Sequence, residues 1–177
     1  MLSWWQSSLG ADQINDTELR TGLWTLRLLA VTLAITPARQ LLGLGALARY
    51  RRMLGLFVFF YAVIHVLTWS WADTNFEVGF MAREIVKHKY ILLGMMTFLL
   101  LVPLALTSTK GSIKRMGGKR WNRLHRLIYL AAVTGTLHYL WSVKKDTFFP
   151  LVYLIVFMSL LGYRAVRAAR ARTPRMA

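Results

Sequence analysis

The sequence contains no cysteine and few acidic residues. Without cysteine among its 177 residues, the chain cannot form disulfides, thiolate zinc sites, Cys-ligated iron–sulfur clusters or covalent c-type haem attachments. Asp and Glu number 7 against 23 Lys and Arg, and only 17% of the chain is charged while 56% is hydrophobic. A soluble domain has about 25% charged residues, so this composition indicates a membrane protein.

The net charge of +16 does not indicate a nucleic-acid-binding protein. Nucleic-acid binders are polar domains with a basic face. Here the basic residues separate long apolar runs, as they do in the cytoplasmic loops of membrane proteins. We therefore expect contact with membrane lipid and no nucleic-acid partner.

Five apolar segments are long enough to cross a bilayer, which takes about 20 mostly apolar residues. The first of them carries Arg27 and is interrupted by Pro37. The sequence predicts one all-α domain over residues 1–177, an integral-membrane bundle of five transmembrane helices. The five segments lie at about 22–42, 53–72, 90–107, 124–143 and 148–163.

Charge predicts the orientation of these helices. Residues 38–52 and 108–123 and the basic tail 164–177 hold no acid, so the positive-inside rule places them, and the C-terminus, in the cytoplasm. All 7 acidic residues fall in the other connections, and residues 1–21 are expected to be an outward-facing N-terminal remnant. Its first ten residues are too short to span and are expected to end a further helix.

Three of the four histidines, His65, His125 and His138, lie within apolar segments of helical length. Ionisable groups at membrane depth are costly and usually functional, and imidazole is a common axial ligand of haem iron. His65 follows Met53 by 12 residues and His138 follows Leu124 by 14, which is roughly 18 and 21 Å from the cytoplasmic ends. Two imidazoles at similar depth predict the ligands of a six-coordinate b-type haem in the outer half of the membrane.

His125 lies at the cytoplasmic end of its segment, where the second span offers Arg51 and no histidine. Arg51 and His65 are 14 residues apart and differ by roughly 40° around a helix. The sequence leaves open whether there are one or two haems. A second haem would lie here, with His125 as a ligand and Arg51 near a propionate, because guanidinium stays protonated. His125 and His138 differ by roughly 140° on an ideal helix, so they cannot share one face without a distortion. Gly135 is expected to allow either a bend or the close approach of a ring.

Other interpretations remain open. A single buried imidazole is often only a hydrogen-bonded core residue, and His88 is expected to be an ordinary residue of the outer surface. Arg27 either extends to the membrane interface or pairs with a propionate of the outer haem. The alternative functions are a haem-free transporter whose histidines relay protons and a generic quinol-linked cytochrome b anchor for another redox partner.

Six motifs, in order along most of the chain, resemble the MsrQ family, the haem-binding membrane subunits of bacterial methionine-sulfoxide reductase systems. The core of this family is similar to the transmembrane domain of ferric reductases and NADPH oxidases. The motifs are LGAD (9–12), ITP (35–37), RRMLGL (51–56), LALTST (104–109), GKRWNRLH (118–125) and HYLWSVK (138–144).

The resemblance implies a bacterial inner-membrane cytochrome b with His65, His125 and His138 as haem ligands and with FMN. It further implies that electrons pass from the quinone pool to a periplasmic molybdopterin subunit, which reduces methionine sulfoxide in oxidised periplasmic proteins. The chain would then be an electron-transfer subunit rather than the catalytic one. The sequence has no GxGxxG dinucleotide fingerprint, so a self-contained ferric reductase that oxidises NADPH is not expected. The family has a further N-terminal helix, of which only the last residues are expected here.

Overall fold

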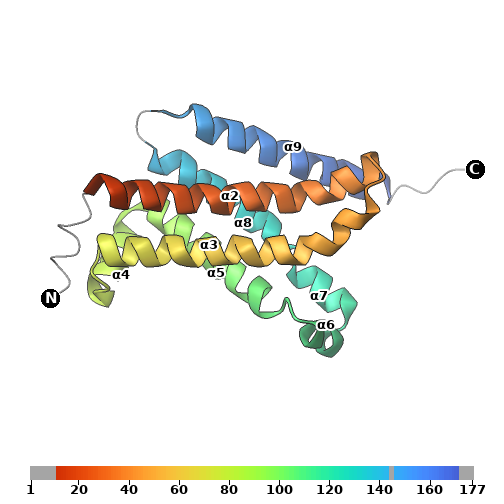
Figure 1. Cartoon of the computed structure of the whole chain (residues 1–177), viewed down its shortest axis with the longest axis horizontal. Coiled ribbons are helices and arrows are strands. Elements are labelled where there is room, and N and C mark those ends of the chain that lie inside the picture. Colours follow the sequence, from red (N-terminus) through yellow and green to blue (C-terminus); the bar gives the residue numbers. More distant parts are fainter. Residues whose placement is uncertain (1–10, 144–145, 172–177) are drawn as a thin grey trace, which may run out of the picture.

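The regular elements are all helices in this computed structural model, which describes residues 11–143 and 146–171 (Figure 1). In chain order they are α2 (Ala11–Leu41), η1 (Gly45–Tyr50), α3 (Arg51–Ala72), α4 (Val78–Lys87), α5 (Lys89–Leu106), α6 (Lys110–Met116), α7 (Gly118–Leu124), α8 (Leu127–Ser142) and α9 (Phe148–Arg170).

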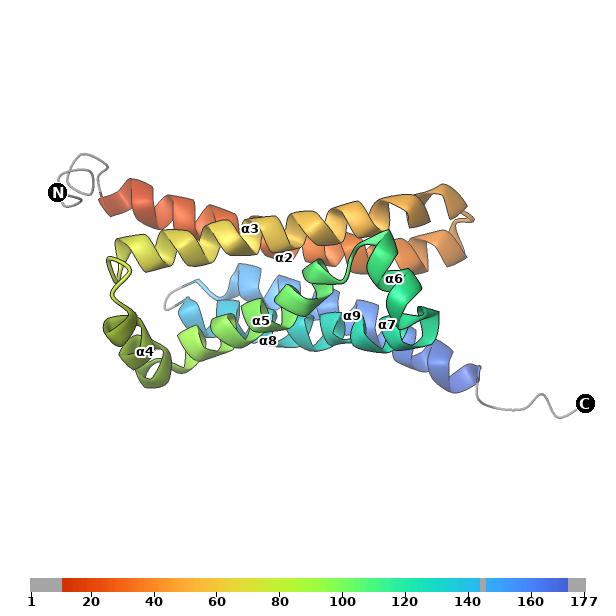
Figure 2. The same ribbon diagram turned by 90° about the horizontal axis from the view of Figure 1, so that it is seen from below.

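The five long helices form an antiparallel bundle. α2 packs along α3, α5 packs along α8, and α9 contacts both α8 and α2 (Figures 1 and 2). α2, α5 and α9 run in one direction, and α3 and α8 run in the other. Residues 42–50, 107–126 and 164–171 therefore lie together at what we call the basic end. The start of α2, residues 73–88, the end of α8 and the start of α9 lie at the opposite, acidic end. The connections predicted to share a side of the membrane thus do lie together.

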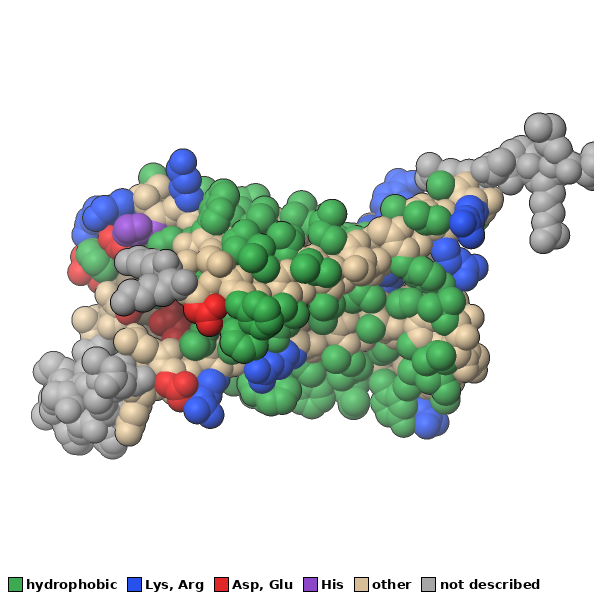
Figure 3. Space-filling model, turned by 90° about the horizontal axis from the view of Figure 1, so that it is seen from above, with side chains coloured by type: hydrophobic (Ala, Val, Ile, Leu, Met, Phe, Trp, Pro, Cys, Tyr) green, Lys and Arg blue, Asp and Glu red, His purple; other side chains and the backbone are tan. Residues whose placement is uncertain are grey.

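The surface of the bundle matches a membrane environment. Apolar side chains cover the middle of the face shown in Figure 3, and the acidic side chains visible there gather at one end. Among the described residues, four helices are long and apolar enough to cross a membrane: 13–41, 45–72, 89–106 and 148–170. The predicted helical membrane bundle is confirmed, but the count of five is approximate. The 16 residues of α8 cover about 24 Å, less than the roughly 30 Å of a hydrocarbon core.

The first long helix begins earlier in the structure than the span that the sequence predicts. α2 starts at Ala11 rather than near residue 22, and it continues through Pro37 to Leu41. Hydropathy locates only the apolar part of a helix, so the polar residues in the first turns of α2 lie outside the predicted span. These polar residues nevertheless stabilise the helix. Arg20, for example, pairs with Asp16 one turn earlier at 2.7 Å. Residues 11–21 are therefore part of α2, while the first ten residues of the predicted remnant lie outside the described part of the chain.

The fourth predicted span is broken near its start. α7 ends at Leu124, His125 and Arg126 form a turn, and α8 begins at Leu127. The chain thus bends at His125 and not at Gly135, which lies inside α8. Of the two roles expected for Gly135, the bend is not found there. A Cβ atom at Gly135 would lie 3.3 Å from Cγ2 of Thr97, so this glycine serves close contact with α5.

The core surrounds α8, because that helix presents small residues to its neighbours. Ala131 and Ala132 are completely buried, and the hydroxyls of Thr134 and Thr97 are hydrogen-bonded at 2.7 Å between α8 and α5. Small residues and interhelical hydroxyl bonds let membrane helices approach closely. This packing fixes α8, and therefore His138, against α5.

Candidate functional site

His65 of α3 and His138 of α8 lie next to each other. Their ring centroids are 6.1 Å apart and the ring planes are inclined by 76°. A metal bound between two imidazoles by bonds of about 2 Å separates the ring centroids by roughly 6 Å. The two histidines that the sequence places at similar depth are therefore spaced to share one iron.

Both imidazoles are held through Nδ1. The Nδ1 atom of His65 lies 3.0 Å from the backbone oxygen of Glu18 in α2, and that of His138 lies 2.6 Å from the backbone oxygen of Tyr90 in α5. A carbonyl oxygen only accepts, so Nδ1 of each ring carries the proton and donates it. This leaves Nε2 as the free nitrogen, which is the arrangement that metal-ligating histidines usually show.

A largely apolar cavity adjoins the two rings. It has a volume of about 260 Å³ and is lined by α2, α3, α5 and α8. The polar Glu18 and Asn15 line it near the acidic end. An apolar environment of this kind keeps water from a buried metal and controls the local dielectric. Its apolar lining includes Leu26, Leu29, Ala62, Met95, Phe98 and Leu101.

The ligand set fits a haem better than a bare metal ion. Among the described residues, no three His, Cys, Asp or Glu side chains gather as a metal site. A protein metal site of the zinc type needs at least three such side chains. Haem iron takes four ligands from the porphyrin and needs only axial ligands from the protein. The pair formed by His65 and His138 is sufficient for that role.

His125 lies at the other end of α8, in the turn after α7. Its ring stacks on Trp121 with centroids 3.7 Å apart, and its Nδ1 donates to the backbone oxygen of Trp121 at 3.1 Å. The backbone of Leu104 is nearby, yet Nε2 is buried without a hydrogen-bond partner among the described residues. A buried polar atom of this kind is rare and is suited to bind a ligand. His125 is not among the residues that line the cavity beside His65 and His138.

Arg51 and Arg164 lie close together at the basic end. Arg51 begins α3 beside Tyr129 and Arg164, and it is also within electrostatic range of His125. The guanidinium group of Arg164 donates to the hydroxyl of Tyr129, to the backbone oxygen of Leu33 and to the hydroxyl of Thr36, each at 2.8 Å. The sequence places Arg164 at the start of a basic tail. In the structure α9 continues to Arg170, and the side chain of Arg164 points into the bundle.

Two further candidates lie outside the cavity lining. Arg27 donates through Nε to the hydroxyl of Tyr153 at 3.3 Å and covers the ring of Trp24 at 5.2 Å. It is exposed and is not one of the cavity residues, so its contact with a propionate stays a prediction. His88 lies at the acidic end with its Nε2 atom 3.2 Å from a carboxylate oxygen of Glu84.

Comparison with known proteins identifies the family. The model of the ferric reductase like transmembrane component matches residues 21–136. A protein-methionine-sulfoxide reductase heme-binding subunit MsrQ from Azospira oryzae is 44% identical over 96% of this chain and 73% of its own length. Proteins of the same name from Xanthomonas campestris pv. campestris and Polaromonas naphthalenivorans are 48% and 47% identical, over 93% and 90% of this chain and 75% and 74% of their own lengths. No solved structure is significantly similar.

The chain belongs to the MsrQ family. With its apolar helices and its match to a transmembrane component, this MsrQ protein is a multi-pass membrane protein. The motifs singled out in the sequence are therefore correctly assigned to this family.

Sequence reasoning missed four residues around the imidazoles of this MsrQ protein. Glu18 and Tyr90 contribute backbone oxygens, and Gly22 and Gly94 lie against the two rings. A carbonyl partner leaves no mark on the residue type. The glycines do leave one, because glycine inside a helix costs about 1 kcal/mol relative to alanine and therefore points to close packing.

Proposed function

We propose that this protein is a cytochrome b of the bacterial inner membrane that passes electrons from the quinone pool to a periplasmic, molybdopterin-containing methionine-sulfoxide reductase subunit. The observation that carries the proposal is the pair His65–His138, with ring centroids 6.1 Å apart beside an apolar cavity. The names of the relatives, heme-binding subunits of a protein-methionine-sulfoxide reductase, support the cofactor and the partner.

Haem b, when bound, supplies one-electron exchange between ferric and ferrous iron. His65 and His138 would hold the haem iron through Nε2. Their Nδ1–H bonds to Glu18 and Tyr90 fix the ring tautomer and orientation and raise the basicity of the ligand atoms. The apolar residues of the cavity exclude water, so the protein sets the burial and local charge of the redox centre.

The basic end is proposed as the entry point for electrons. His125 offers a buried, unpartnered Nε2 within the described residues, and Arg51 offers a cation for a propionate of a second haem. The family resemblance also implies FMN and quinone. The phosphate of FMN requires cationic partners, which the arginines of this end would supply.

The positive-inside rule supports an orientation with the basic end and the C-terminus in the cytoplasm. The acidic end then faces the periplasm, where electrons leave for the partner subunit. Because His65 and His138 lie nearer the acidic end than His125 does, the histidine pair is the centre nearest to that exit.

Haem quantification tests the proposal. The purified wild-type protein should show b-type bands in a reduced-minus-oxidised difference spectrum, and His65→Ala and His138→Ala should each lose the haem that this histidine pair binds. His88→Ala serves as the control, because it removes a surface imidazole at the same end and should retain wild-type haem content.

The same measurements separate the alternatives. A wild-type protein without haem bands would contradict the proposal and favour a proton-relaying transporter. Unchanged haem content in both His65→Ala and His138→Ala would exclude this pair as the ligands. Co-purification with a molybdoenzyme would distinguish the proposed partner from that of a generic quinol-linked cytochrome b anchor.

A further inference from the structure

The two imidazoles are held in the same way on two different helices. His65 of α3 donates to the carbonyl of Glu18 in α2, and Gly22 follows that carbonyl by four residues. His138 of α8 donates to the carbonyl of Tyr90 in α5, and Gly94 again follows by four residues. Each of the two packed helix pairs, α2–α3 and α5–α8, thus contains one imidazole bonded to the carbonyl four residues before a glycine.

Steric contact explains the glycines. A Cβ atom at Gly94 would lie 2.8 Å from Nδ1 and 2.9 Å from Cε1 of His138. One at Gly22 would lie 3.1 Å from Cε1 and 3.3 Å from Nδ1 of His65. In a helix the Cα–Cβ bond leans toward the preceding turn, over the side of the carbonyl four residues earlier. A side chain at Gly94 would occupy the space of the His138 ring, and one at Gly22 would require the His65 ring to shift by a few tenths of an ångström.

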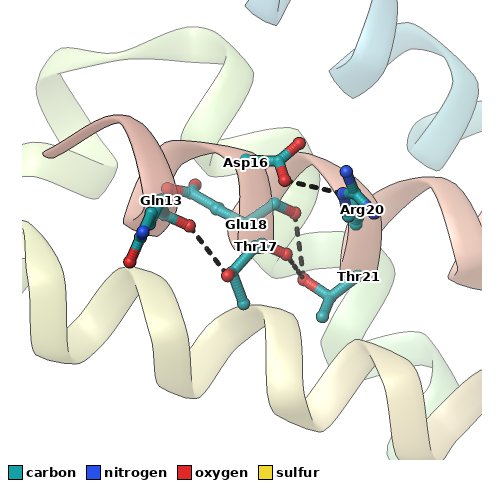
Figure 4. Close-up of polar contacts among 6 residues, drawn as sticks. All are labelled: Gln13, Asp16, Thr17, Glu18, Arg20 and Thr21. Atoms are coloured by element: carbon teal, nitrogen blue, oxygen red, sulfur yellow. Dashed lines mark hydrogen bonds and ion pairs between the residues drawn. The ribbon is translucent and has the colours of Figure 1, made fainter. Parts of the chain in front are cut away.

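The α2 contact, formed by Gly22 and the Glu18 carbonyl, holds its imidazole less tightly than the α5 contact does. Figure 4 shows the hydroxyl of Thr21 reaching back to the carbonyls of Thr17 and Glu18, at 2.9 Å from each. The Glu18 oxygen therefore accepts from Thr21 as well as from His65, and its bond to His65 is 3.0 Å long. The bond from His138 to Tyr90 is shorter, at 2.6 Å. We expect the α5 contact to constrain its imidazole more strongly.

We propose that Gly22 and Gly94 are positioning residues for the haem ligands. Each glycine opens a notch in a helix surface, in which the imidazole of the neighbouring helix reaches a backbone oxygen. The two notches fix Nε2 as the ligand atom and set the 76° angle between the ring planes. This inference rests on the proposed function, in that His65 and His138 bind the haem.

The variants Gly94→Ala and Gly22→Ala test whether these glycines position the imidazoles, and Gly55→Ala is the matched control. Gly55 lies in α3, inside a helix like the other two, but a Cβ atom there would meet nothing within 4 Å. Gly162→Ala in α9 is a second control of the same kind. The full-length variants are purified in detergent. Their haem content, ferric EPR spectrum, midpoint potential and rate of haem transfer to apomyoglobin are then measured.

We expect Gly94→Ala to bind haem with a changed EPR line shape, which reports the angle between the imidazole planes. The loss of the Nδ1–H bond lowers ligand basicity, so the ferric state is less stabilised and the potential should rise. Haem transfer to apomyoglobin should be about 10-fold faster or more, because losing such a hydrogen-bond partner typically lowers metal affinity by about that factor. Gly22→Ala should show the same changes to a smaller extent, and both controls should match the wild type.

The proposed positioning role of the two glycines would be disproved if Gly94→Ala and Gly22→Ala matched Gly55→Ala in EPR spectrum, midpoint potential and rate of haem transfer. Should Gly94→Ala fail to fold, the milder contact at Gly22 still provides this test. That outcome leaves the haem proposal intact, because the ligands themselves are tested by His65→Ala and His138→Ala. Retention of haem in those two variants would instead reject the proposed function and the notches with it.

Discussion

The two ends of the bundle differ in what they offer a redox cofactor. Toward the acidic end, His65 and His138 lie 6.1 Å apart, and both are fixed through Nδ1. At the basic end, His125 stacks on Trp121, its Nε2 has no hydrogen-bond partner within the described part of the chain, and Arg51 is its charged neighbour. The first site can supply both axial ligands of one iron. The second supplies one imidazole and positive charge.

This difference indicates how the two ends are specialised. A site with two imidazoles held by backbone carbonyls has little freedom to change its ligands. A site with one imidazole and several guanidinium groups is suited to negatively charged groups, because arginine binds carboxylates and phosphates through paired hydrogen bonds. The following predictions test whether the two ends are independent.

The largest expected effect is the loss of the acidic-end EPR signal when a histidine of that site, but not His125, is replaced. His65→Ala should remove the low-spin ferric EPR signal of the acidic-end site. His125→Ala should leave that signal and its midpoint potential unchanged, because His125 contributes nothing to the cavity. EPR-monitored redox titration of both variants is the measurement. Loss of the acidic-end signal in His125→Ala would show that the sites are not separate.

A smaller effect is expected from Arg164→Ala at the basic end. The substitution removes three hydrogen bonds that join α9 to α2 and α8. We expect it to lower the free energy of unfolding by about 2 kcal/mol, within the range for bonds to charged groups. Thermal unfolding in detergent measures this.

Arg167→Ala is the control for that measurement, since its 3.4 Å contact with Tyr163 is exposed. The EPR signal of the acidic-end site should be unchanged in both variants. Equal stability of Arg164→Ala and Arg167→Ala would contradict an anchoring role for Arg164.

The smallest effect concerns a carboxylate of the acidic end. Burial and the neighbouring Glu84 raise the pKa of Asp73 above its ordinary value of 3.8. The folded state therefore binds more protons than the unfolded state just above pH 3.8, and stability falls as the pH rises through the folded pKa. As the pH rises, the melting temperature of Asp73→Asn should therefore fall less than that of the wild type. An identical pH profile in the variant would show that Asp73 does not contribute.

Several features of the bundle could be predicted from sequence because they depend on local patterns. Apolar runs of helical length gave the spans, and the absence of acids from 38–52 and 108–123 indicated which connections share an end. The depth of His65 and His138 followed from a constant rise per residue. The start of α2 was missed because helix boundaries do not coincide with the boundaries of apolar runs, as the ion pair of Asp16 and Arg20 shows.

The sequence by itself determined an all-helical membrane bundle with two imidazoles at one depth, since periodicity, hydropathy and charge are properties of consecutive residues. Only the tertiary structure decided which backbone holds each ring. The bonds of His65 and His138 reach carbonyls 47 and 48 residues away, and Gly22 and Gly94 matter only because α2 packs on α3 and α5 packs on α8. Only the tertiary structure likewise decided that the Arg164 side chain points into the bundle and that the helical segment is interrupted at His125. A contact between helices depends on their packing and relative rotation, which no single segment specifies.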